Sequence, residues 1–157
     1  MTLEASERVG IECHAYYNTG SYDTEVWAEM KRVQDLSVPK GKGSAELKSR
    51  LSKFVYKRGT FKEPAISFGY LYKAGADSVR DALLDSFSNN TALDVLILDD
   101  LVTESGASGV RMYVEVMKFD DDQAMDNGKA IAVEASPTPV YDGSGDLIEP
   151  DLDFAVA

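Results

Sequence analysis

The sequence has one cysteine, Cys13, and one histidine, His14, among its 157 residues. A single cysteine excludes a disulfide within the chain, and a single histidine excludes a histidine-rich metal site. No apolar run approaches the roughly 20 residues that a membrane helix requires, so we expect no membrane partner. Residues 1–12 carry acids early and lack the apolar stretch of a secretory signal, so we expect no signal peptide. The chain as a whole is 44% apolar and 27% charged, which is typical of a globular protein.

Positive charge is scarce outside one segment. The chain carries a net charge of -11, which should repel DNA, RNA and anionic membranes. Residues 40–62 nevertheless hold eight of the sixteen basic residues and one acid, Glu46, whereas the rest of the chain has 26 acids and eight bases. Separated blocks of opposite charge steer and orient association. The basic segment therefore predicts a negatively charged partner, either the chain's own acidic surface or a nucleic acid.

Alternation of apolar and polar residues predicts strands along most of the chain. The expected strands cover residues 9–17, 26–38, 65–73, 93–98, 110–119 and 129–135. A helix is predicted over residues 77–88, because Asp77 or Ser78 can cap it and apolar residues recur there at helical spacing. Six or seven strands and one helix favour a mainly β (α+β) fold, an antiparallel β-sandwich or barrel with one flanking α-helix.

The predicted domain organisation is simple. Residues 1–139 are expected to form the sandwich domain, with a basic arm at residues 39–63 and the helix at 77–88. Residues 140–157 are expected to form an acidic C-terminal tail. The chain from residue 136 onward is broken by prolines and rich in acids, a pattern too irregular for the core.

No constellation of residues for catalysis is evident. Cys13 and His14 are neighbours on a strand and point to opposite faces, so we expect a buried cysteine and a partly exposed histidine. The aspartates at 120–122 and 126 resemble a calcium loop in composition, but Ala124 stands where a ligand is needed, which favours a solvated turn. We therefore expect no enzyme activity, no cofactor and no metal site.

The basic segment is predicted to be an exposed hairpin or arm with a half-apolar face. Apolar residues lie among its lysines, and exposed apolar groups rimmed by charge are typical of an interaction surface. A hairpin that only aids solubility and an arm that stacks on nucleic-acid bases stay open as alternatives. Head-to-tail self-association is favoured, because repeated contacts of this type generate rings and stacked arrays. The predicted interface residues are Lys40, Lys42, Lys48, Arg50, Leu51, Lys53, Phe54, Lys57, Arg58 and Lys62, and the candidate acidic partner surface holds Asp142, Asp146, Glu149, Asp151 and Asp153.

The order of these features resembles the phage major tail tube proteins over residues 8–140. The resemblance begins with a short strand ending in YYNTG, the strand VWAEMKRVQDLSV and the charged excursion KGKGSAELKSRLSKF. It continues with the strand PAISFGYLY, the helix DSVRDALLDSF and the strand ALDVLILDD. It ends with a glycine loop before GVRMYVEVMKF and the strand KAIAVEASPTP.

This resemblance implies a ring-forming β-sandwich with a flanking helix. The protein would be made in the host cytoplasm and would form homo-hexameric rings that stack into the tail tube of the virion, beside other phage tail proteins. In that family the long excursion reaches into the neighbouring ring, a role that would fall here on residues 40–62. The lumen is acidic, so genome DNA slides through without specific binding.

Two alternatives stay open. The first is another phage-type assembly protein, such as a tail terminator or the tube of a phage-derived injection apparatus. The second is a nucleic-acid-binding or ligand-binding β-barrel that uses the basic arm.

Overall fold

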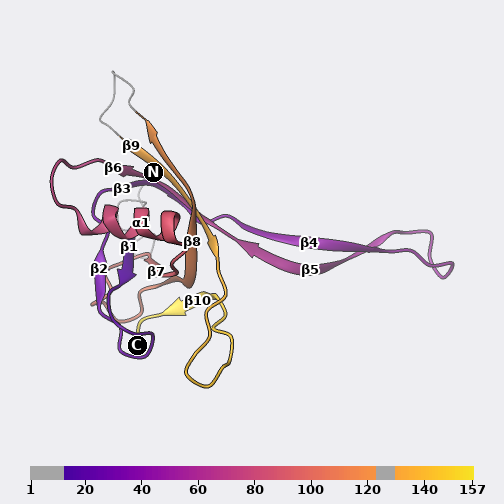
Figure 1. The fold of residues 1–157 in the computed structure, drawn as a ribbon. Helices are drawn as coiled ribbons and strands as arrows, with labels where there is room; N and C mark the ends of the chain where they lie inside the picture. The colour runs from indigo at the N-terminus through magenta and orange to yellow at the C-terminus, as the bar shows by residue number, and fades with distance from the viewer. Residues whose placement is uncertain (1–12, 123–129) are drawn as a thin grey trace, which may run out of the picture.

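The computed structural model describes residues 13–122 and 130–157, which form a mainly antiparallel β fold (Figure 1). The strands are β1 (His14–Asn18), β2 (Trp27–Glu29), β3 (Val33–Ser37), β4 (Lys40–Leu47), β5 (Tyr56–Pro64), β6 (Ile66–Leu71), β7 (Leu93–Leu98), β8 (Ser108–Asp122), β9 (Ala130–Pro137) and β10 (Asp151–Ala155). The helix in this described part of the chain is α1 (Ser78–Asn89). The predicted fold class, mainly β with one flanking helix, is confirmed. No helix in the described ranges has the length and apolar composition to cross a membrane.

The long strand β8 joins the two halves of the main sheet. The strand order is β2-β1-β7-β8-β9-β6-β3, and β10 pairs with β8 beside this path. The first part of β8 pairs with β7 and β10, whereas the part from Val114 onward pairs with β9. Val95 and Met112 from one half and Tyr70 and Ile131 from the other belong to one buried apolar core. The two halves therefore enclose a common core, as the faces of a sandwich do.

Helix α1 packs on β8 and covers one side of the core. Asp77 caps the helix: its backbone is extended and its carboxylate accepts the N–H groups of Val79 and Arg80. Ser86, a residue of the helix, is fully buried where α1 meets β8, and its hydroxyl accepts the N–H of Val116 at 3.1 Å. The predicted helix is confirmed, and it starts one residue after Asp77 because that residue is the cap.

Residues 26–38 form two strands, whereas their β-branched content predicts one. The chain breaks at Met30, whose side chain is buried in the core and whose N–H donates to the carbonyl oxygen of Ala15 at 2.8 Å. As a result β2 pairs with β1 and β3 pairs with β6, at opposite ends of the strand order. The prediction of a single strand is wrong because β propensity is a local property. It does not show that the chain crosses from one edge of the sheet to the other.

The expectation that the chain beyond residue 136 is too irregular for the core is also wrong. Residues Asp151–Ala155 form β10, which pairs with β8. Leu152 packs against the main core and Phe154 packs against a second apolar cluster around Leu96. The aspartates of β10 alternate with these residues and face solvent, so the segment is an amphipathic edge strand. The division of the chain at residue 140 stays a prediction.

Candidate assembly interface

Strands β4 and β5 form a two-stranded hairpin, the arm, which projects from the body of the molecule (Figure 1). The ladder runs from Lys40 opposite Pro64 to Leu47 opposite Tyr56. Pro64 is buried where the arm meets the body, whereas almost every other residue of the two strands is exposed. The predicted exposed hairpin is confirmed. Such a hairpin gains little stability from its own chain, so its apolar and charged side chains are available to a partner.

One face of the arm is rich in lysine. Residues directly opposite one another in an antiparallel ladder share a face, and Lys42 lies opposite Lys62. The side chain of Lys42 also leans over Gly59, where an added β-carbon would lie 2.5 Å from it. Like charges placed directly opposite destabilise a ladder, so an acidic partner on this face would relieve the repulsion. Alternation along the strands gives this lysine face the residues Lys40, Lys42, Lys57 and Lys62, with one acid, Glu46, opposite Lys57.

The arm ends in a tip, residues 48–55, where exposed apolar side chains lie among basic ones. Leu51 is 98% exposed and Phe54 is 74% exposed. The hydroxyls of Ser49 and Ser52 accept the N–H groups of Leu51 and Phe54, at 3.0 and 3.2 Å. Turns of this kind order the backbone locally, so the tip presents Leu51 and Phe54 in a defined way. Lys48, Arg50 and Lys53 of the predicted interface lie on the same tip.

The arm and the candidate acidic surface do not meet within one chain. Within the described residues, the ion pair that the arm makes is Lys48 with Glu46 at 3.6 Å, inside the arm itself. The acids of the candidate surface are all exposed. Asp142 accepts the N–H groups of Ser144 and Asp146 at 2.8 and 3.0 Å and so orders a turn before β10. Within one copy, no ion pair joins the described arm to these acids.

A buried ion pair, which the sequence analysis did not single out, holds the loop at residues 19–26 on the sheet. Arg111 on β8 donates to both carboxylate oxygens of Asp94 on β7, at 3.2 and 2.7 Å. The guanidinium also donates to the carbonyl oxygen of Tyr22 and lies over the rings of Tyr22 and Trp27, 4.0 and 5.0 Å from their centroids. Burial acts to lower the pKa of Arg111, but the hydrogen bonds and charge of Asp94 outweigh it and raise that pKa. The sequence signal was a carboxylate inside the apolar run LDVLIL.

The remaining titratable residues form no grouped site in the described part of the chain. No three His, Cys, Asp or Glu side chains there are placed to hold a metal ion. Cys13 is exposed, so the expectation of a buried cysteine is wrong; it precedes β1 at the edge of a pocket. His14 is partly buried, as expected, and its Nδ1 lies 2.6 Å from Oε1 of Glu29. Asp120, Asp121 and Asp122 lie in β8 and pair with β9, so the expectation of a turn at these residues is wrong; the aspartate at 126 lies outside the described residues.

The fold of this chain is similar to solved structures of proteins from assembled tails. No protein-family model and no curated protein sequence matches the chain. Among solved structures, the SPP1 tail tube matches with a TM-score of 0.68 at 12% identity, over 95% of this chain and 80% of that one. This chain has the tail tube fold. The expected resemblance to tail tube proteins is thus confirmed at the level of the fold.

Two further structures share the tail tube fold. The tail of an empty gene transfer agent particle, solved with sixfold symmetry, matches with a TM-score of 0.64 at 10% identity, over 90% of this chain and 98% of that one. The sheath–tube complex of an extracellular contractile injection system matches with a TM-score of 0.56 at 10% identity, over 94% and 93%. All three neighbours are parts of assembled tails or injection systems.

Proposed function

We propose that this chain is the structural subunit of a tail tube and assembles into homo-hexameric rings that stack. The observation that carries the proposal is the basic arm, which projects from an otherwise acidic body that has the tail tube fold (Figure 1). A contact between the arm of one copy and the body of the next is heterologous. Heterologous contacts repeat from copy to copy and so build rings and stacked arrays.

In the proposed tube, the arm of each subunit binds the neighbouring ring. The bases Lys48, Arg50 and Lys53 at the tip and the lysine face along the arm meet acids of the neighbour. The acidic surface at residues 142–153 is the proposed acceptor for the lysine face. Complementary charge steers two subunits into register before their apolar surfaces meet.

Genome DNA passes through the proposed lumen without specific binding. Outside residues 40–62 the chain has 26 acids and eight bases, and a wall of this sign repels phosphate groups. The proposal places the protein in the tail of the virion, with other tail proteins at the ends of the tube. It assigns the chain no enzymatic activity, in keeping with neighbours that are structural components.

Electron microscopy of the purified protein tests this function. We expect rings or tubes with sixfold symmetry. A monodisperse monomer that retards DNA in a gel at moderate salt would contradict the tube and support a nucleic-acid-binding barrel.

The tube of a phage-derived injection apparatus is a second candidate function. Similarity to the contractile injection system, and to the baseplate of the anti-feeding prophage with a TM-score of 0.58 at 7% identity, favours it. Isolated particles that contain this subunit separate the two functions. A DNA-filled head on the tube supports a tail, whereas a sheathed tube without DNA supports an injection apparatus.

A further inference from the structure

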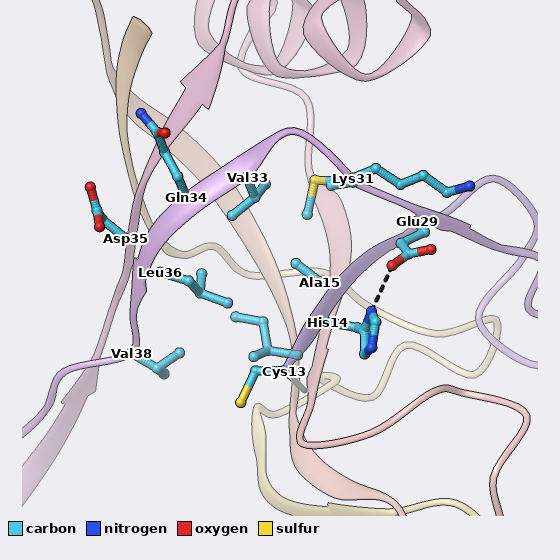
Figure 2. A pocket seen from close by; sticks show the side chains of 12 residues that line it. Cys13, His14, Ala15, Glu29, Lys31, Val33, Gln34, Asp35, Leu36 and Val38 are labelled. Carbon is cyan, nitrogen blue, oxygen red and sulfur yellow. Dashed lines mark hydrogen bonds and ion pairs between the residues drawn. The ribbon is translucent and has the colours of Figure 1, made fainter. Parts of the chain in front are cut away.

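The sandwich is open between β2 and β3, and a pocket lies in this opening. These two strands end the strand order and do not pair with each other, because the chain crosses from one to the other at Met30. The pocket has a volume of about 740 Å³. Figure 2 shows Leu36 and Val38 reaching toward Cys13 and Ala15 across the space, whereas Asp35 points away from it.

The lining of the pocket is mostly apolar and belongs to the edge of the core. Its apolar lining residues are Ala15, Met30, Val33, Leu36, Val38 and Ile97. The charged residues that border it are Glu29, which is bonded to His14, together with Lys31 and Asp35. An open apolar concavity of this kind is typical of a site that a partner fills.

The tip of the arm has the matching character. Leu51 and Phe54 are 98% and 74% exposed, and turns at Ser49 and Ser52 order the backbone that presents them. The pocket volume falls within the range that ordinarily accommodates a small ligand, so it has room for one leucine and one phenylalanine side chain. The positively charged arm also approaches a body that carries most of the acids of the chain.

The tip cannot reach the pocket of its own chain. The arm begins just beyond Val38, which lines the pocket, and its paired strands run outward from Lys40 to Leu47. At about 3.3 Å per residue, these eight residues separate the tip from the body by roughly 26 Å. Figure 1 shows the arm extended away from the rest of the molecule. An occupant from this arm must therefore come from a second copy.

We infer that the tip of one copy docks into this pocket of another copy, with Leu51 and Phe54 buried against β1 and β3. The contact rests on the proposed function and specifies how the arm holds the next subunit. Because the pocket lies at the base of the acceptor's own arm, each copy is at once donor and acceptor. The contact is heterologous, so it can repeat from copy to copy and build a stack.

Cysteine cross-linking tests the contact in the full chain, because Cys13 is the only cysteine and lines the pocket. Leu51→Cys adds a thiol at the tip, and Lys53→Cys adds one that leaves Leu51 and Phe54 in place. Ser44→Cys, at an exposed position halfway along β4, is the matched control on the arm. Each variant is assembled, checked for tubes by electron microscopy and oxidised mildly. Covalent products are then separated under denaturing, non-reducing conditions.

We expect a ladder of disulfide-linked oligomers from both tip variants and none from the Ser44→Cys control. Adding Cys13→Ser to either tip variant should abolish the ladder, whereas dimers that persist would show tip-to-tip pairing and overturn the inference. Tubes without a ladder in both tip variants would also overturn it, and would leave the tube function standing. An unaltered chain that forms neither rings nor tubes would contradict the proposed function itself, and the docking contact with it.

A substitution in the pocket gives an independent readout. Val33→Trp fills the space from the β3 side, and Val33→Ile is the conservative control. We expect loss of stacking with Val33→Trp in a chain whose circular dichroism spectrum stays native, and normal tubes with Val33→Ile. Normal tubes from both variants would show that the pocket is not the docking site.

Discussion

Nη2 of Arg111 lies 2.7 Å from Oδ2 of Asp94, and the two side chains are only 9% and 3% exposed. The pair joins β7 to β8 on the face of these strands that is opposite the main core, and its guanidinium is covered by Tyr22 and Trp27. A buried charge is tolerated because each partner neutralises the other and the guanidinium also donates to the carbonyl oxygen of Tyr22. The ion pair therefore fixes the loop at residues 19–26 against the sheet.

Removing one partner of this pair should destabilise the protein strongly. Arg111→Ala leaves the Asp94 carboxylate buried without a counter-charge, and the expected loss is about 3–5 kcal/mol in the free energy of unfolding. Chemical denaturation followed by circular dichroism measures it. The double variant Asp94→Leu/Arg111→Met should lose less than Arg111→Ala, because no charge is left buried. Equal losses would show that packing of the arginine, and not its charge, is what matters.

Gly109 should not tolerate any side chain. It lies opposite Leu98 in the ladder of β7 and β8, and an added β-carbon would sit 1.7 Å from the carbonyl oxygen of Ile97. The backbone must shift to relieve this clash, so we expect Gly109→Ala to cost about 3 kcal/mol or more. Gly143→Ala is the control, since no heavy atom lies within 4 Å of a β-carbon added there. Similar melting temperatures for the two variants would refute the close approach.

The hydrogen bond from Tyr70 to Asp77 should make stability depend on pH at both ends of the range. The hydroxyl donates to the two carboxylate oxygens at 3.0 and 2.8 Å. Burial acts to raise the pKa of Asp77, but hydrogen bonds from Tyr70, Arg80 and Val79 outweigh it and lower the pKa. Burial, and then the bond to Asp77, raise the pKa of Tyr70.

The signs of these two shifts define a window of pH. Because the pKa of Asp77 is lowered in the folded state, its carboxylate stabilises the fold above about pH 4, and this stabilisation is lost as the pH falls through the folded pKa. Because the pKa of Tyr70 is raised in the folded state, its protonated hydroxyl stabilises the fold below about pH 10, and this stabilisation is lost as the pH rises through the folded pKa. Tyr70→Phe should therefore cost about 1–3 kcal/mol between these limits and less at low pH, where Asp77 is protonated. Unfolding measured across pH checks this, and a difference that is constant down to acid pH would contradict it.

The local elements of the fold could be predicted from the sequence, but the strand partners could not. Helix α1 is predicted by a capping Asp77 that precedes apolar residues at helical spacing. The arm is predicted by the basic composition of the segment between Pro39 and Pro64. The break at Met30 depends on which edges β2 and β3 join, which no local pattern contains. Strand β10 did carry a signal, since apolar and acidic residues alternate along it, but the prolines before it obscured that signal.

Some features of the candidate assembly interface could be predicted from the sequence, and others could not. The exposure and positive charge of the arm follow from composition alone. The pairing of Lys42 with Lys62 does not, because a register shift between Lys42 and Ser44 sets which residues share a face. The pocket also could not be predicted from local sequence patterns, since β1 and β3 come together only because the chain crosses at Met30.

Reversing the charge of the tip should block stacking and leave the chain folded. The triple variant Lys48→Glu/Arg50→Glu/Lys53→Glu replaces exposed bases that contribute about 0.2–1 kcal/mol each in isolation. These small contributions are repeated at every subunit of a ring, so the effect on stacking should be large. Electron microscopy should show rings without tubes, and the melting temperature should stay unchanged. The matched control, Lys48→Arg/Lys53→Arg, should form normal tubes; long tubes from the triple reversal would refute the electrostatic contribution.

Salt should slow the formation of tubes more than it dissolves them. Charge complementarity mainly raises the rate of association, whereas an apolar tip buried in a pocket is insensitive to ionic screening. The screening length falls from about 10 Å at 0.1 M to about 3 Å at 1 M salt, so steering by the arm is lost over this range. Light scattering should show slower growth of tubes as salt increases, while tubes formed at low salt persist after transfer to high salt. Charge-conserving tip variants should keep this dependence. Rapid dissolution of preformed tubes at high salt would mean that the lysine face, rather than Leu51 and Phe54, holds the stack together.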